Sequence, residues 1–268
     1  MCYSFFMRGL LFYALFLAAA APAAASGLVD FTKPSKKASV SHPSRPKPWT
    51  SYTLHSEDGL SVHLVHVDGG VQRNVCRMNA DAVAVSLHEQ HLNRPKPAKN
   101  FRAEKRGDFY DQREGIVSGG WIAGGLGRKN GGVDLLYVTT SPDLPSDLDQ
   151  EAGKEARSEK GERPALYSFE EAKAKADETS GPVGRVRMID GPSLKVDVIR
   201  LAGRAAVKNT ASASTILFAV EGGVEARVTG PAVVLSGNRM FLTSPGATVH
   251  IGTNPGKPAY LLLITPSN

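Results

Sequence analysis

The sequence is poor in cysteine and in charge, and this limits the class of protein it can encode. Of 268 residues only two are cysteine and only 22% are charged, while 41% are hydrophobic. A chain this apolar is not wholly disordered. No repeat or low-complexity class dominates either. With 27 glycines and 17 prolines the chain has too many turn formers to be mostly helical, and its length suits two modest domains or one large β-rich one.

The one long apolar run is at the N-terminus. Arg8 precedes an apolar stretch from Gly9 to Ala21, and Ala23–Ala25 supply the small residues that a signal peptidase requires before Ser26. The stretch is shorter than the ~20 apolar residues of a membrane-spanning helix. We therefore expect residues 1–25 to be a cleaved signal peptide, which leaves a secreted or periplasmic protein without a transmembrane anchor.

Export would remove Cys2 and leave Cys76 as the only thiol, so no intramolecular disulfide can form. In an oxidising compartment such a thiol is either buried or available for an intermolecular bond. Cys76 lies in a strand-like run, Asn74–Met78, which favours the buried state.

The formal net charge of +6 is unevenly distributed. Residues 26–48 are rich in Pro, Ser and Lys and carry +4, which predicts a flexible basic tail. Residues 49–140 carry +1, residues 141–182 carry −5 and residues 183–268 carry +5. We interpret these segments as a β-rich domain, an acidic linker and a second β domain, and we expect the linker to lie against the basic domain.

The pattern of residues 49–140 predicts short strands separated by turns. Leu60–Val67 is an apolar strand, and Val71–Met78 is expected to be its hairpin partner. Seven glycines lie between positions 119 and 132, but they match neither a P-loop nor a dinucleotide-binding fingerprint, so they predict tight turns.

One short helix is expected in the acidic linker. Ser168 and Glu171 have the spacing of a capping box, and Glu171 lies four residues before Lys175, which is the favourable order for a helical ion pair. We expect this helix to dock through Leu166, Tyr167 and Phe169 or to be only partly formed.

The most regular pattern is in residues 183–268, where eight short apolar runs alternate with Gly, Pro, Asn and Ser. This is typical of a β-sandwich or barrel. The expected strands are Arg185–Ile189, Leu194–Leu201, Thr215–Val220, Val224–Val228, Ala232–Leu235, Arg239–Leu242, Ala247–Ile251 and Ala259–Thr265. Glu221-Gly222-Gly223 is expected to close a hairpin between the third and fourth strands.

This C-terminal pattern resembles the two-motif core of the cupin superfamily. The hairpin is followed by Gly237, Pro245-Gly246, His250 and Asn254, which is similar to the second cupin motif, although two extra residues separate Gly237 from Pro245. The resemblance implies a mainly β fold with a C-terminal cupin-like double-stranded β-helix, or jelly roll. If the first β-rich region is a degenerate jelly roll too, the protein is a bicupin.

The metal ligands of the first cupin motif are missing. Where metal-binding cupins carry His-x-His and Glu, the segment Lys208–Thr215 contains no histidine and no acid. A divalent metal in a barrel usually needs three or four N or O ligands, more than His250 and Asn209 supply. No cofactor is therefore predicted for this domain. The residues expected to bind a ligand at the barrel mouth are His250, Asn254, Asn209 and Arg239.

An alternative metal site lies in the first region. His88 and His91 are three residues apart, so a helical turn would present both rings on one face, although the sequence is not the His-Glu-x-x-His of zinc peptidases. In a bicupin these two residues would hold a divalent metal, and an exposed polar turn is the alternative. His63 and His66 are expected to point to opposite faces of a strand.

These patterns favour an exported binding or accessory module for a small molecule or carbohydrate over an enzyme. The sequence has no nucleophile elbow, and its carboxylates gather in the linker. Basic residues of the C-terminal region alternate with apolar ones without a stacking-aromatic pattern, so no nucleic-acid partner is expected. Two alternatives stay open: a metal-dependent isomerase or oxygenase of bicupin type, and a structural protein whose basic tail binds an anionic envelope polymer. A homodimer is also open.

Overall fold

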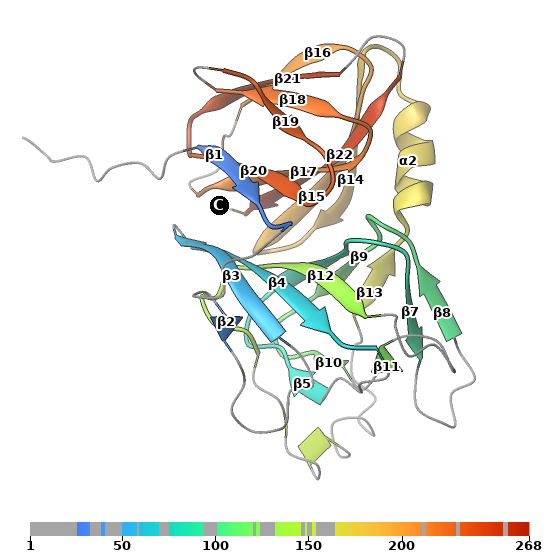
Figure 1. The fold of residues 1–268 in the computed structure, drawn as a ribbon, viewed down its shortest axis with the longest axis vertical. Coiled ribbons are helices and arrows are strands. Elements are labelled where there is room, and N and C mark those ends of the chain that lie inside the picture. The colour runs from blue at the N-terminus through green and yellow to red at the C-terminus, as the bar shows by residue number, and fades with distance from the viewer. Residues whose placement is uncertain are drawn as a thin grey trace, which may run out of the picture.

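The computed structural model describes residues 26–32, 39–40, 50–57, 59–69, 75–93, 101–119, 122–123, 132–145, 148, 152–153, 164–208, 210, 213–228, 231–253 and 257–267. Within these ranges the chain forms antiparallel sheets arranged as two β units, with a helix at their side (Figure 1). The predicted mainly β class is confirmed. No helix in these ranges is long and apolar enough to cross a membrane.

The N-terminal unit is built on a seven-stranded sheet. In spatial order its strands are β13 (Ala165–Tyr167), β9 (Phe109–Gln112), β6 (Ala82–Ser86), β12 (Val133–Thr139), β4 (Leu60–Val67), β3 (Thr50–Glu57) and β2 (Ser39–Val40). Two smaller sheets complete it. One pairs β10 (Val117–Gly119) with β5 (Val75–Arg77), and the other has the order β11 (Ile122–Ala123), β7 (Gln90–Asn93) and β8 (Phe101–Glu104).

The hairpin expected between Leu60–Val67 and Val71–Met78 is not formed. β4 pairs instead with β3 and β12, and β5 pairs with β10. Because β4 is buried along nearly its whole length, it needs a long neighbour on each side, which the three-residue β5 does not provide. Cys76, on β5, is fully buried, as predicted.

The C-terminal unit consists of two facing sheets. The six-stranded sheet has the order β1 (Gly27–Asp30), β20 (Arg239–Thr243), β17 (Thr215–Glu221), β22 (Ala259–Pro266), β15 (Leu194–Leu201) and β14 (Val183–Asp190). The four-stranded sheet has the order β16 (Arg204–Lys208), β21 (Thr248–Thr253), β18 (Val224–Arg227) and β19 (Val233–Leu235). All eight strands predicted for this region are present, whereas β16 was not predicted. Apolar residues from both sheets meet between them in one core cluster.

From β15 to β18, and again from β19 to β22, the chain alternates between the two sheets. β17 pairs with β20 and β22, whereas β18 pairs with β19 and β21, so the hairpin expected at Glu221-Gly222-Gly223 is wrong. The chain crosses between the sheets at Gly222, where φ is +76° and an added Cβ would lie 3.0 Å from the Cβ of Ala259. Glycine suits both the positive φ and the close approach.

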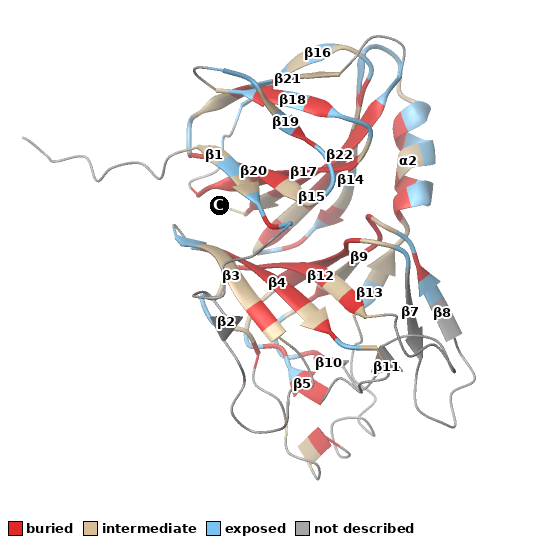
Figure 2. Ribbon diagram, viewed as in Figure 1, coloured by how far each residue is buried: buried red, intermediate tan, exposed pale blue. Residues whose placement is uncertain are grey.

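The largest core cluster lies between the two units (Figure 2). Alternate residues of β4, β6 and β12 face this core from one side, and alternate residues of β15, β17 and β22 face it from the other. Since side chains alternate along a strand, the same strands also fill a separate core within each unit. The two units therefore share a continuous apolar interface.

The flexible tail expected over residues 26–48 does not include residues 27–30. These form β1, which pairs with β20 at the edge of the C-terminal sheet. Figure 1 shows this blue strand lying beside the orange strands of the far end of the chain. Phe31 follows and is only 1% exposed in the shared core, where its ring lies 6.4 Å from that of Phe218. Apolar burial thus anchors a segment whose composition suggested a tail.

The helix predicted in the acidic linker is present as α2 (Phe169–Asp177). The side chain of Ser168 accepts a hydrogen bond from the backbone N–H of Glu171, which caps the first turn. The helix packs on β14 and β15. At its end, Asp177 accepts a 2.6 Å hydrogen bond from the hydroxyl of Tyr260, and burial together with this bond raises the pKa of Tyr260 to about 12. This part of the acidic segment therefore lies against the C-terminal unit.

The residues before the helix dock it on the N-terminal unit. Tyr167 lies on β13 and stacks on Phe109 with ring centroids 5.4 Å apart, and Phe169 is buried in the shared core. Docking through these two residues is confirmed, while Leu166 is only half-buried in β13.

Candidate functional site

Of the four predicted binding residues, the structure describes His250 and Arg239, and it places these two on different sheets. His250 is exposed on β21, between Val249 and Ile251, which both face the core of the C-terminal unit. Because neighbouring residues of a strand point to opposite faces, His250 lies on the outer surface of the barrel. Arg239 lies on the other sheet, where its Nε donates a 2.8 Å hydrogen bond to Asp30. Asn209 and Asn254 lie outside the described residues.

The helical turn expected for His88 and His91 is absent. His91 is part of strand β7, in register with Ala103, and its side chain lies outside the described part. His88 precedes that strand, and its Nε2 lies 2.8 Å from an oxygen of Asp134. A shared site for the two histidines therefore stays a prediction.

Asp134 is instead the centre of a two-histidine cluster. Its second oxygen lies 2.6 Å from Nδ1 of His66, and Nε2 of His66 lies 3.1 Å from Asp68. These contacts raise the pKa of His66, and the bond to Asp134 raises that of His88. Burial alone would raise the pKa of Asp134, but the two histidines outweigh it and hold that pKa well below its usual range.

His63 points away from this cluster, as predicted for a strand. It is 3% exposed, and its Nδ1 lies 3.2 Å from the hydroxyl of Thr53. Its Nε2 has no hydrogen-bond partner among the described residues. Burial lowers the pKa of His63, which favours the neutral ring.

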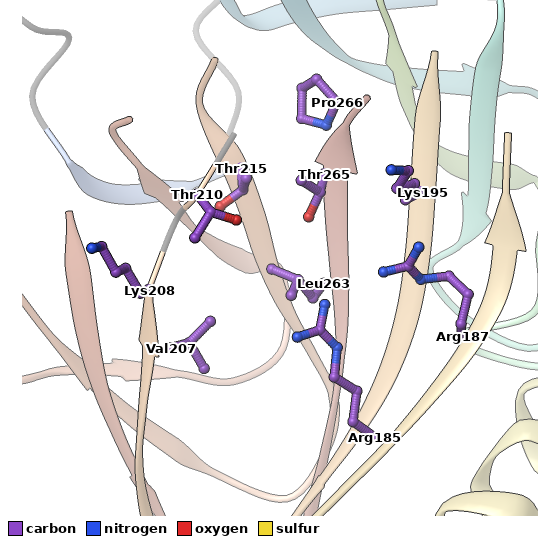
Figure 3. Close-up of a pocket in the computed structure, with 10 residues that line it drawn as sticks. All are labelled: Arg185, Arg187, Lys195, Val207, Lys208, Thr210, Thr215, Leu263, Thr265 and Pro266. Atoms are coloured by element: carbon purple, nitrogen blue, oxygen red, sulfur yellow. The ribbon is translucent and has the colours of Figure 1, made fainter. Parts of the chain in front are cut away.

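A pocket of about 160 Å³ lies at one end of the C-terminal barrel (Figure 3). Its walls come from β14, β15, β22 and the start of β17 on one sheet, and from the end of β16 on the other. The lining residues comprise four cations, three threonines and three apolar residues. They are Arg185, Arg187, Lys195, Lys208, Thr210, Thr215, Thr265, Val207, Leu263 and Pro266.

Strand register explains why these side chains meet. Asp197 is in register with Arg187 on one side and with Leu263 on the other, so all three project to the same face of the sheet. That face is the inside of the barrel, since Leu263 belongs to the core between the two sheets. At the pocket end of the barrel, charged and hydroxyl side chains therefore replace the apolar side chains of the core.

Asp197 is a buried carboxylate held by two arginines. It is 1% exposed, and it accepts hydrogen bonds from Nε and Nη2 of Arg187 and a 2.5 Å bond from Nη2 of Arg185. A buried charge is tolerated only when it is paired and hydrogen-bonded, as here. The bonds to Asp197 raise the pKa of Arg187.

None of the pocket residues was identified as a site from the sequence. The sequence pattern that could have identified them is the spacing of Arg185 and Arg187, two residues apart on one strand. Lys195 and Asp197 have the same spacing on the next strand. Alternation between basic and apolar residues was interpreted only as an argument against nucleic-acid binding. On paired strands it also gathers charge on one face.

The most informative comparisons are with solved structures. A cupin 2 conserved barrel domain protein from Leptotrichia buccalis superposes with a TM-score of 0.57 at 8% identity, covering 90% of this chain and 96% of that one. A glyoxylate-induced protein from Pseudomonas aeruginosa gives 0.56 at 11% identity over 92% of both chains. The chain has a cupin fold. Salicylate 1,2-dioxygenase from Pseudoaminobacter salicylatoxidans gives 0.57 at 13% identity, covering 80% of this chain and 72% of that one.

The cupin likeness covers both β units, because the first two matches span at least 90% of the chain. By sequence, no family model and no curated protein matches the chain.

The cupin fold raises the question of a metal in either barrel, and the described residues do not fit one. Inside the C-terminal barrel, the strand that carries His250 contributes Val249 and Ile251, and the polar end carries arginines and lysines that repel a cation. In the N-terminal unit, His63 is buried in register with Tyr137 of the apolar core, and its hydrogen-bond partner is the hydroxyl of Thr53. No three His, Cys, Asp or Glu side chains within the described ranges are placed to bind a metal ion together.

Proposed function

We propose that the protein is an exported, non-catalytic cupin that binds a small molecule at the open end of its C-terminal barrel. The observation that carries this proposal is the pocket between the two sheets, which combines charged nitrogens, hydroxyls and an apolar floor. Its volume of about 160 Å³ is below the ~300–1,000 Å³ of pockets for drug-sized ligands, which favours a compact ligand.

The chemistry of the lining supports binding rather than catalysis. General acid–base catalysis needs a positioned group that gains and loses a proton near neutral pH. The pocket is lined by arginine, lysine and threonine, and the adjacent carboxylate of Asp197 is already engaged by two arginines. The dioxygenase among the structural neighbours shares the fold at 13% identity, which does not transfer its reaction to this chain.

Export is supported by the leader-like sequence and is compatible with the fold. The hydroxyl of Ser26 donates a 3.1 Å bond to the Ser244 hydroxyl and accepts a 2.9 Å bond from the Ser244 backbone N–H. A chain cut before Ser26 would keep both contacts and the whole of β1. Binding of an anionic envelope polymer is a further part of this proposal. The basic residues that would carry it, Lys33, Lys36, Lys37, Arg45 and Lys47, lie outside the described residues.

A variant that fills the pocket tests the binding proposal. Thr265 lines the pocket and is half-buried, so Thr265→Phe would occupy the space without adding charge. In a thermal-shift screen of compact polar metabolites, we expect some compounds to raise the Tm of the wild type but not that of Thr265→Phe, because only a bound ligand stabilises the folded state. Val234→Phe, at an exposed position of β19, is the control for the added ring. The proposal fails if no compound shifts the Tm, or if the shifts are equal in Thr265→Phe.

A further inference from the structure

The pocket has a charge that selects its ligand. Four cations line it, and two carboxylates, Asp197 and Asp190, pair with three of them. Among the described residues, the site therefore carries two more positive than negative charges. Resting on the proposed function above, we propose that the ligand is a compact oxyanion, a carboxylate or a phosphate, bound through Arg185.

The two arginines have different roles in this site. Arg187 uses Nε and Nη2 on Asp197 and Nη1 on Asp190, so each of its nitrogens is already engaged. Arg185 uses only Nη2, on Asp197, and its Nε and Nη1 have no partner among the described residues. Arg187 is therefore the positioning residue, and Arg185 is the arginine with hydrogen-bond donors to spare.

Asp197 fixes the position of Arg185 through one guanidinium nitrogen, and among the described residues the other two nitrogens of Arg185 stay free to bind a ligand. The side chain of Arg185 is 53% exposed, and the single bond to the buried carboxylate holds one end of its guanidinium. Figure 3 shows this guanidinium beside Leu263, among the lining residues. A guanidinium with two free N–H-bearing nitrogens suits the paired oxygens of a carboxylate or phosphate.

Hydroxyl and apolar groups complete the site. Thr215 and Thr265 line the pocket from the neighbouring strands β17 and β22 (Figure 3), and neither hydroxyl has a hydrogen-bond partner among the described residues. Hydroxyls can donate to an oxyanion. Leu263 and Val207 give the pocket an apolar side that can contact a carbon skeleton. A small organic acid would use both kinds of surface.

Titration of the full mature chain with three probes tests this assignment. The probes are benzoate, its neutral isostere benzamide, and inorganic phosphate, each followed by calorimetry at low salt. We expect benzoate or phosphate to bind at least about tenfold more tightly than benzamide, because charge-assisted hydrogen bonds require the anion. Which of the two anions binds more tightly distinguishes a carboxylate ligand from a phosphate ligand.

Two variants and a matched control test whether the anion binds in this pocket. Arg185→Gln should weaken anion binding about tenfold or more, since it removes the charge and the free donors. Arg227→Gln removes the same charge from the outer face of β18 and should change the affinity less than about twofold. Thr265→Val, which removes an unpartnered hydroxyl at nearly constant volume, should weaken binding about threefold or more without lowering the Tm. This second variant is independent of the contact between Arg185 and Asp197.

The outcomes separate this inference from the proposed function. Equal binding of benzamide and benzoate, or unchanged anion affinity in both Arg185→Gln and Thr265→Val, would overturn the assignment while small-molecule binding still stands. Absence of any anion binding at millimolar concentrations would also overturn it. A failed metabolite screen with Thr265→Phe, by contrast, contradicts the pocket as a binding site of any kind.

Discussion

At the scale of single residues, Arg106 holds the two units together. Its guanidinium donates to the carbonyl oxygen of Leu87 in the N-terminal unit, at 2.5 Å. In the C-terminal unit it donates to three carbonyls, at 2.6–3.2 Å, and lies 4.9 Å from the centre of the Phe218 ring. Those three carbonyls belong to Val220, Ala219 and Gly237. Only a planar group with five donors and no acceptor can satisfy four carbonyls at once.

Replacing this arginine should therefore destabilise the whole chain. Arg106→Met keeps much of the apolar stem but leaves four carbonyls without their donor. We expect a loss of about 2–4 kcal/mol in the free energy of unfolding, measured by urea titration. Lys105→Met, at the exposed neighbouring position, is the control and should change stability by less than about 0.5 kcal/mol. Equal effects of the two substitutions would contradict the role of Arg106.

For individual site residues, the sequence allowed some predictions and not others. The motif spacing of His250 predicted a place at the barrel mouth, but its neighbours Val249 and Ile251 are the residues that face the core. Strand alternation, visible in the sequence, already favours this outcome. The partner of Arg185 could not be predicted, because the contact with Asp197 depends on how two strands align.

At the scale of elements, the cluster of His66, His88 and Asp134 joins the ends of three chain segments. It links the end of β4, the start of β12 and the turn after β6. Both ring nitrogens of His66 face carboxylates, and those of His88 face Asp134 and the carbonyl oxygen of Glu89. A neutral imidazole has one N–H, so only the protonated rings can donate in both directions.

This cluster should make stability depend on pH. The raised pKa values of the histidines give a contribution that is complete below pH about 6.5 and is lost as the pH rises through the raised values. The lowered pKa of Asp134 gives a contribution present above pH about 4 and lost in acid. The cluster is therefore most stabilising between about pH 4 and 6.5.

Removing both histidines should flatten this dependence. Between about pH 6 and 9 we expect the wild type to lose roughly 0.5–1 kcal/mol relative to the double variant His66→Gln/His88→Gln. The effect is modest because the histidine side chains are about 40% exposed and solvent screens the pairs. Urea unfolding at several pH values measures it. A stability difference that does not change with pH would rule out this coupling.

The positions of the strands in the sequence were easier to predict than the strands with which they pair. The apolar runs that became β17 and β18 are separated by Gly222-Gly223, so their positions follow from local composition. Their assignment to opposite sheets depends on contacts with β20, β22, β19 and β21, which lie far along the chain. Local patterns carry no information about such pairing, and a short glycine turn predicts a hairpin by default.

At the scale of the whole molecule, the shared core ties the start of the chain to its end. β1 pairs with β20, and Phe31 enters the apolar interface of the two units. The basic composition of residues 33–48 concealed the role of the preceding residues, because a four-residue edge strand and one phenylalanine leave little periodic signal.

The proposed export predicts which residue begins the mature chain. Mass spectrometry of the exported protein should find Ser26 at its N-terminus, because the small residues before it match a signal-peptidase site. Ala25→Lys should block this cut and accumulate the precursor, whereas Ser39→Lys, which introduces the same residue well beyond the site, should not. An exported protein that retains residues 1–25 would contradict the proposal.

Under the proposed export, the contact between Ser26 and Ser244 predicts an order for maturation. Proteases act on accessible, unstructured chain, whereas the residues just after the expected cut are engaged by β20 once the sheet is complete. No spacer separates the leader from this strand. Under this proposal, release of the leader is expected to precede closure of the sheet edge by β1, because a β20 edge without β1 is open to pairing with other chains.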